Sequence, residues 1–80
     1  MKYVYLLESI ADPRQSYAGI TDDLRNRLKE HNAGEATHTR KYMPWRLVTY
    51  LAFSNEKKAI AFERYLKTAS GRAFANKRLR

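Results

Sequence analysis

The chain has no cysteine among its 80 residues, which excludes a disulfide framework and a thiolate zinc site. It also has no long hydrophobic run. The apolar stretch from Tyr3 to Leu7 is stopped by Glu8, so it is too short for a signal-peptide core or a membrane-spanning helix. These absences predict a protein that is soluble, cytoplasmic and kept in a reducing compartment.

Acidic residues are scarce. Eight Asp and Glu stand against sixteen Lys and Arg, and no acid follows Glu63. A solvated basic tail would explain this imbalance without any function. We favour a nucleic-acid contact surface, because excess positive charge concentrates polyanions and phosphate contacts release counterions. The side chains expected to make these contacts are Arg64, Lys67, Arg72, Lys77 and Arg78. Charge alone does not distinguish an enzyme from a passive binder.

The length allows one domain at most, and we expect residues 1–80 to form it. Hydrophobic residues make up 44% of the chain, which is enough for a small core and is not typical of disorder. The β-branched and aromatic stretches Tyr3–Leu7 and Ser16–Ile20 predict two strands, joined through a turn at Asp12-Pro13. Trp45–Phe53 predicts a third strand.

Two amphipathic helices are expected between and after these strands. Thr21 is a suitable N-cap for the first helix, with Asp22 and Asp23 in its first turn, and Gly34 suits a left-handed cap at its end. One face of this helix carries Leu24, Arg27, Leu28 and His31.

The second helix is expected to begin at Ser54 or Asn55 and to be broken by Gly71, with a last short helix over residues 72–79. The order is therefore β-β-α-β-α-α. A three-stranded sheet flanked by helices, of the α/β (α+β) class, is the economical way to bury these elements.

Glu63 is the best carboxylate candidate for a metal ligand, because it lies at the edge of the apolar stripe of its helix. The eight acids are scattered along the chain, so a one-metal site is more plausible than a two-metal site. Lys67 follows at i+4, however, and an ion pair in that order is an ordinary surface feature. The pattern alone leaves both interpretations open.

Other polar residues also have two interpretations. Arg27 could serve a site or merely solvate its head group while its stem packs, and His31 could titrate near neutral pH or cap the helix C-terminus. Tyr5 and Tyr17 could be ordinary sheet residues. Gly19 is less easily dismissed, because a glycine within a strand indicates that something approaches the backbone closely.

Taken together, these motifs resemble the GIY-YIG nuclease superfamily, specifically its small stand-alone bacterial members. The likeness extends to the N-terminal catalytic domain of the excision-repair nuclease subunit. It covers nearly the whole chain, and the ordered set is more specific than any single motif. The matching segments are Tyr3-Val4-Tyr5-Leu6-Leu7, Tyr17-Ala18-Gly19, Thr21-Asp22-Asp23-Leu24, Arg27-Leu28, His31-Asn32, Gly34, Pro44-Trp45, Leu47-Val48, Ala61-Phe62-Glu63 and Leu66-Lys67.

The resemblance implies a three-stranded antiparallel sheet between helices and a nuclease that uses one divalent metal ion, Mg²⁺ or Mn²⁺. By this resemblance Glu63 is the metal ligand, and Arg27 contacts the scissile phosphate. Tyr5 and Tyr17 lie beside the attacking water, and His31 assists proton transfer there.

We therefore expect an endonuclease that hydrolyses DNA, in repair or in the processing of structured DNA. The alternatives are a non-catalytic nucleic-acid-binding module on the same fold, and an accessory subunit that needs a partner protein for substrate targeting. Asn76 is a candidate counterpart of a polar residue that some relatives carry near the domain end. His38 is interpreted as a solvated loop residue rather than a second active-site histidine.

Overall fold

The computed structural model describes residues 1–80 and contains one sheet and three α-helices. In chain order the elements are β1 (Lys2–Ser9), β2 (Ser16–Thr21), α1 (Leu24–Asn32), the 3₁₀ helix η1 (Arg40–Tyr42), β3 (Trp45–Phe53), α2 (Glu56–Leu66) and α3 (Ala69–Arg78). The strands are antiparallel in the order β2-β1-β3. The predicted fold class and element order are confirmed. None of the helices has the length and hydrophobicity needed to span a lipid bilayer.

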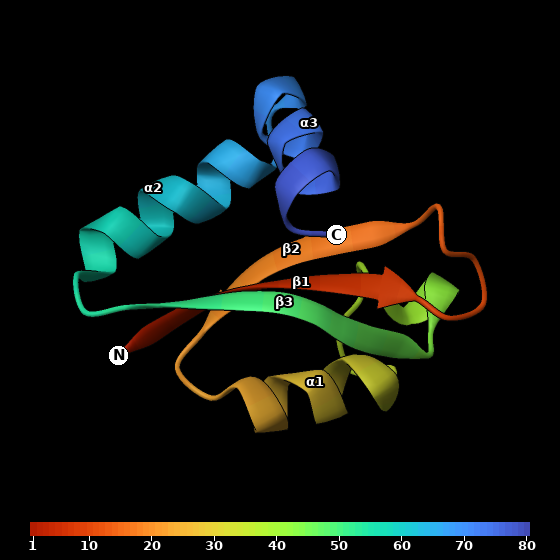
Figure 1. Ribbon diagram of the computed structural model, residues 1–80. Coiled ribbons are helices and arrows are strands. Elements are labelled where there is room, and N and C mark those ends of the chain that lie inside the picture. Colours follow the sequence, from red (N-terminus) through yellow and green to blue (C-terminus); the bar gives the residue numbers. More distant parts are fainter.

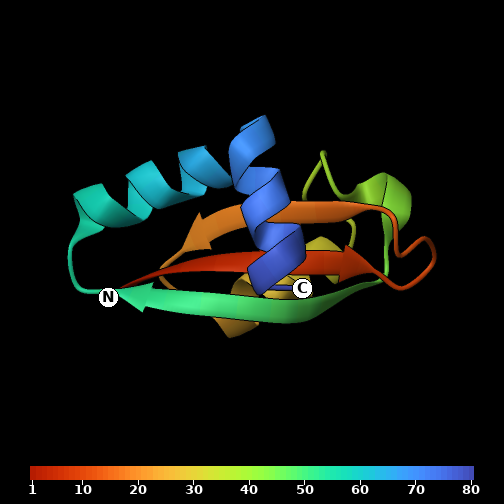
Figure 2. The same ribbon diagram turned by 45° about the horizontal axis from the view of Figure 1, so that its top comes forward.

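The sheet separates two layers of helices. Helix α1 lies against one face, and α2 and α3 cover the other (Figure 1). The turned view shows α2 running along the sheet while α3 crosses over it (Figure 2). The side chains of the central strand β1 alternate between the two faces, so one strand supplies both cores.

Each face of β1 builds its own small core. Val4 and Leu6 pack with residues of α2 and α3, including Ala59, Leu66 and Ala75. On the other face, three buried side chains form the second core with partly buried residues of α1 and the neighbouring strands. These three are Tyr5, Leu7 and Trp45. Tyr5, one of the two tyrosines that the sequence singles out, is therefore part of the core beneath α1.

The start of α1 differs from the sequence expectation. Asp23, not Thr21, is the N-cap, and its side chain accepts a hydrogen bond from the backbone N–H of Asn26 at 3.1 Å. The Thr21 hydroxyl instead accepts from the backbone N–H of Asp23 at 3.1 Å, forming a turn before the helix. At the other end Gly34 has φ +77°, which confirms the left-handed cap.

Gly71 does not break the second helical segment as predicted. Helix α2 already ends at Leu66, and Gly71 lies in the first turn of α3, where its backbone N–H donates to the N-cap hydroxyl of Thr68 at 3.0 Å. A Cβ at this position would overlap the carbonyl of Tyr65. Glycine is therefore needed here for the close approach of two helix ends. At the start of α2, Asn55 is the N-cap.

The loop between α1 and β3 is held by specific hydrogen bonds. The Asn32 side chain at the end of α1 accepts from the backbone N–H of Trp45 at 2.6 Å and donates to its carbonyl at 3.0 Å. The indole N–H of Trp45 donates to the carbonyl of Thr39 at 2.8 Å. This loop thus fixes Thr39 beneath the sheet, next to α1.

Candidate active site

A chain of buried hydrogen bonds connects β1, α1 and the following loop. The Tyr5 hydroxyl lies 2.9 Å from Nε2 of His31, and Nδ1 of the same ring lies 2.6 Å from the hydroxyl of Thr39. The Thr39 hydroxyl also lies 3.4 Å from the carbonyl of Ala36, to which it can donate. In the tautomer with hydrogen on Nδ1, Nδ1–H donates to Thr39 and Nε2 accepts the proton of Tyr5.

Gly19 provides the space that this arrangement needs. Tyr5 and Gly19 face each other in the β1–β2 register, and a Cβ on Gly19 would overlap the hydroxyl and Cζ of the tyrosine. The close approach that the sequence predicts at this glycine is thus made by the ring of Tyr5. The absence of a side chain on the neighbouring strand lets this ring lie across it and reach His31.

Tyr17 forms the accessible side of the cluster. Its ring centroid lies 5.2 Å from that of His31 and 6.4 Å from that of Tyr5. His31 is fully buried and Tyr5 is only 2% exposed, whereas Tyr17 is partly exposed on the edge strand β2. A molecule arriving from solvent would therefore meet Tyr17 before the buried pair.

Glu63 lies on α2, on the opposite face of the sheet, and adjoins the cluster through Lys67. Its carboxylate forms an ion pair with Lys67 at 2.7 Å, as the i, i+4 spacing predicts, yet its side chain is only 13% exposed. The Lys67 ammonium lies 5.5 Å from the centroid of the Tyr17 ring. This pair therefore meets the tyrosines beside the edge strand β2, and Glu63 is more enclosed than a surface ion-pair residue.

Arg27 adds a permanent positive charge on the α1 side. Its guanidinium pairs with Glu30 at 3.0 Å, and it lies beside Tyr5. The carboxylate of Glu30, followed by the Tyr5 hydroxyl, raises the pKa of Arg27 above its already high ordinary value. The side chain is 35% exposed, so this guanidinium is accessible to a ligand while being held in position.

The surroundings keep both buried groups neutral near pH 7. Burial raises the pKa of Tyr5, which the adjacent Arg27 opposes and the charge of Glu63 reinforces. Burial, followed by the charge of Arg27, lowers the pKa of His31. Both groups are therefore neutral at rest, and a neutral imidazole has a nitrogen that can accept a proton.

A cavity of about 570 Å³ opens beside Tyr17, between β2 and α3. Lys67 and Arg72 line it, whereas Arg64, Lys77 and Arg78 do not and are exposed elsewhere on α2 and α3. Both His38 and Asn76 also line the cavity. His38 is exposed, and the Asn76 side chain accepts a hydrogen bond from Arg80 at 2.9 Å.

The structure thus brings together four of the residues singled out as catalytic, Tyr5, Tyr17, Arg27 and His31, and places the candidate metal ligand Glu63 beside them through Lys67. Sequence reasoning missed Thr39, which holds the His31 ring, and Arg14 and Arg80, which line the cavity. No local pattern marks Thr39, since its role depends on how the loop after α1 folds back. For the two arginines, the excess of basic residues is the one sequence feature that indicates a contact with nucleic acid.

Residues 1–78 match the GIY-YIG catalytic domain. The chain belongs to the GIY-YIG family. The matched model is that of a catalytic domain, which supports the sequence prediction of an enzyme.

Two groups of proteins are similar to this GIY-YIG chain. One comprises proteins named structure-specific endonuclease subunit SLX1. The chain is 38% identical to that of Candida dubliniensis over 73 residues and 37% identical to the SLX1 homolog of Giardia intestinalis over 65 residues. These alignments cover 82% and 76% of the chain but only 26% and 18% of those proteins.

The second group comprises short proteins named UPF0213. The chain is 37% identical to one from Haloquadratum walsbyi over 67 residues, which covers 82% of the chain and 73% of that protein. The solution NMR structure of the UPF0213 protein BH0048 from Bacillus halodurans superimposes with a TM-score of 0.58 at 32% identity. This superposition covers 96% of the chain and 84% of that protein.

Proposed function

We propose that residues 1–80 act as a single cytoplasmic domain that hydrolyses DNA phosphodiester bonds with one divalent cation, Mg²⁺ or Mn²⁺, in repair or in the processing of structured DNA. One observation carries the proposal. Side chains from β1, β2, α1 and α2 converge beside one edge strand, where a base, cations and a carboxylate lie together. The SLX1 relatives, named as structure-specific endonuclease subunits, support an activity that depends on substrate structure.

Glu63 would hold the divalent cation. Its carboxylate is largely enclosed and already attracts a cation, the ammonium of Lys67 at 2.7 Å, so the donor fits a positive ion. A single protein carboxylate would leave the other coordination positions of the cation to water and phosphate oxygens. When bound, such a cation offsets phosphate charge and lowers the pKa of a coordinated water.

The Tyr5–His31 pair would remove the proton from the attacking water. As the Tyr5 oxygen accepts a proton from water, its own proton passes to Nε2 of His31, 2.9 Å away. Thr39 keeps the imidazole in the tautomer that can accept this proton. Tyr17, the accessible member of the cluster, would orient the water.

Arg27 would contact the scissile phosphate and stabilise the charge that develops on its oxygens during attack. Its guanidinium is always charged and is held by Glu30 at 3.0 Å. The basic side chains of α2 and α3 would bind the DNA backbone without reading sequence. These backbone contacts are assigned to Arg64, Lys67, Arg72, Lys77 and Arg78.

The test compares cleavage of supercoiled plasmid, branched DNA and single-stranded DNA with Mg²⁺, Mn²⁺ or EDTA. Glu63→Gln should abolish metal-dependent cutting while DNA binding stays nearly unchanged, because the basic surface remains. Glu56→Gln is the matched control, since this exposed carboxylate lies in the first turn of the same helix. Full activity of Glu63→Gln would remove the assigned metal role. Binding without cutting by the wild type would favour a non-catalytic module.

A further inference from the structure

The cavity beside Tyr17 is chemically unlike the buried cluster that it adjoins. It lies between the edge strand β2 and helix α3, and no carboxylate side chain lines it. Besides the polar side chains of Gln15, Ser16, His38 and Asn76, its lining has a cationic part and an apolar part. Cationic side chains are contributed by the β1–β2 loop, the end of α2 and α3, and apolar side chains are contributed by the core. The cationic members are Arg14, Lys67, Arg72 and Arg80.

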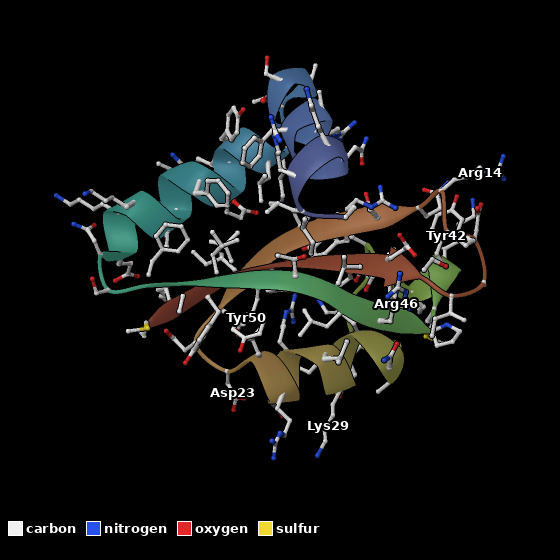
Figure 3. The ribbon with its side chains drawn as sticks, viewed as in Figure 1. Arg14, Asp23, Lys29, Tyr42, Arg46 and Tyr50 are labelled. Atoms are coloured by element: carbon white, nitrogen blue, oxygen red, sulfur yellow. The ribbon has the colours of Figure 1, made fainter.

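These four cations differ in how far they are already neutralised. Lys67 pairs with Glu63, Arg80 with Glu8, and Arg14 with Asp12. Arg72 forms no ion pair and no side-chain hydrogen bond, and it is exposed. Arg14 lies at the tip of the β1–β2 hairpin and points outward (Figure 3). Arg72 is therefore the cation in the cavity that is available to pair with a bound anion. A nucleic-acid strand leaving the cavity would pass Arg14.

The apolar part of the lining suits a base rather than a second phosphate. The buried side chains of Leu66 and Ala75 close the floor of the cavity, and the partly exposed ring of Tyr17 stands at its side as the apolar surface that a base can contact. A cationic groove combined with apolar and aromatic surface is the combination by which proteins hold unpaired nucleotides. A phosphate alone would need no such wall.

The size of the cavity excludes a double helix. Its volume of about 570 Å³ is within the range of small-molecule sites, and the whole domain is only 17 Å across its shortest axis. A duplex could lie across the mouth but could not enter. The volume is sufficient for one unpaired nucleotide, with Arg72 available to a phosphate and the Tyr17 ring available to a base.

We propose that this cavity is a subsite for one unpaired nucleotide next to the scissile phosphodiester. The proposal rests on the proposed nuclease function, and it specifies a substrate with a single-stranded segment at the cut. Tyr17 joins the two sites, because it lines the cavity and packs against His31 with ring centroids 5.2 Å apart. Selection of the substrate follows, since a fully paired strand cannot place a nucleotide in the cavity.

The test uses Arg72→Gln, with Arg78→Gln as the matched control. Both arginines are exposed on α3, but only Arg72 lines the cavity. Cleavage is measured on a duplex and on the same sequence with unpaired nucleotides at the cut. Arg72→Gln should lower kcat/KM on the unpaired substrate about tenfold, as expected for the loss of one charged hydrogen bond. On the duplex Arg72→Gln should lower kcat/KM only as much as Arg78→Gln does, which is the loss expected for one backbone contact. Arg78→Gln should lower both slightly and equally.

A binding experiment separates failure of the subsite from failure of the nuclease. Short oligothymidylate is titrated into ¹⁵N-labelled protein without metal, and amide shifts are followed. Shifts concentrated at Ser16–Ala18 and Gly71–Asn76, and weakened by Arg72→Gln, would support the subsite even if nothing is cut. Two results would overturn the proposal: shifts spread evenly over the basic surface, or equal losses on paired and unpaired DNA in Arg72→Gln.

Discussion

Replacing Gly19 with alanine should damage the stability and the activity of the enzyme together. The new Cβ would overlap the hydroxyl of Tyr5 and lie 2.9 Å from its Cε1. The Tyr5 ring is buried and packs against Tyr17 and His31, so it can move aside only by leaving its hydrogen bond to His31. Gly19→Ala therefore both overpacks the core and disconnects the proposed proton acceptor.

The size of the effect follows from these two losses. Overpacking a core costs about 1–3 kcal/mol, and losing one hydrogen bond costs about 1 kcal/mol. Alanine restricts the unfolded chain more than glycine does, which stabilises the folded state by about 0.5–1 kcal/mol and offsets part of this loss. We expect the free energy of unfolding to fall by about 2 kcal/mol, and the Tm of a domain of this size to fall by roughly 10 °C.

Gly34→Ala is the matched control. Its φ of +77° makes alanine unfavourable, but the nearest atoms to a new Cβ belong to Met43 at 3.6 Å, so nothing collides. The backbone strain costs about 1 kcal/mol and does not affect Tyr5. Urea unfolding followed by circular dichroism gives the stabilities, and cleavage is measured at a temperature where both variants are folded. Wild-type stability and wild-type cleavage by Gly19→Ala would refute the steric argument.

Three further predictions concern the residues around this ring. Arg27→Ala should lower kcat much more than affinity for DNA, because one phosphate contact among many adds little to binding, and an equal loss of both would mark Arg27 as a general contact. Thr39→Val should lower the free energy of unfolding by about 1–3 kcal/mol, since it leaves Nδ1–H of His31 unsatisfied in a buried site. Thr37→Val, at an exposed position of the same loop, should change it little in the same urea titration. The unfolding free energy should also fall as pH decreases below 6.5, the ordinary pKa of histidine, because the unfolded chain takes up a proton before buried His31 does. The decline should level off below the folded-state pKa of His31, and a curve of the same shape in His31→Gln would contradict that assignment.

The sequence predicts the elements of this fold well because its periodic patterns are strong. Trp45–Phe53 is a strand over the predicted range, and the hairpin strands extend the predicted ones by one or two residues at their ends. Errors arise where two residues of similar chemistry compete. Thr21 and Asp23 can both cap a helix, and only the path of the chain leaving β2 selects Asp23.

The candidate site is less predictable because most of it depends on contacts distant in sequence. Family resemblance could indicate which residues matter, such as Tyr5 and Glu63, but not that they approach from opposite faces of the sheet. The buried tautomer of His31 depends on Thr39, whose position depends on a loop with no regular pattern. The cavity exists only because α3 packs back beside β2, and no local sequence signal encodes that return.

The position of Tyr5 on the central strand has a consequence for how the enzyme loses activity. Strand β1 is hydrogen-bonded on both edges and contributes side chains to both cores, so its amides should exchange with solvent only when the whole domain opens. Tyr5 can therefore leave its position only when the whole domain unfolds, which is also the event that disrupts either core. Heat inactivation and global unfolding should follow a single curve, with no folded but inactive form between them.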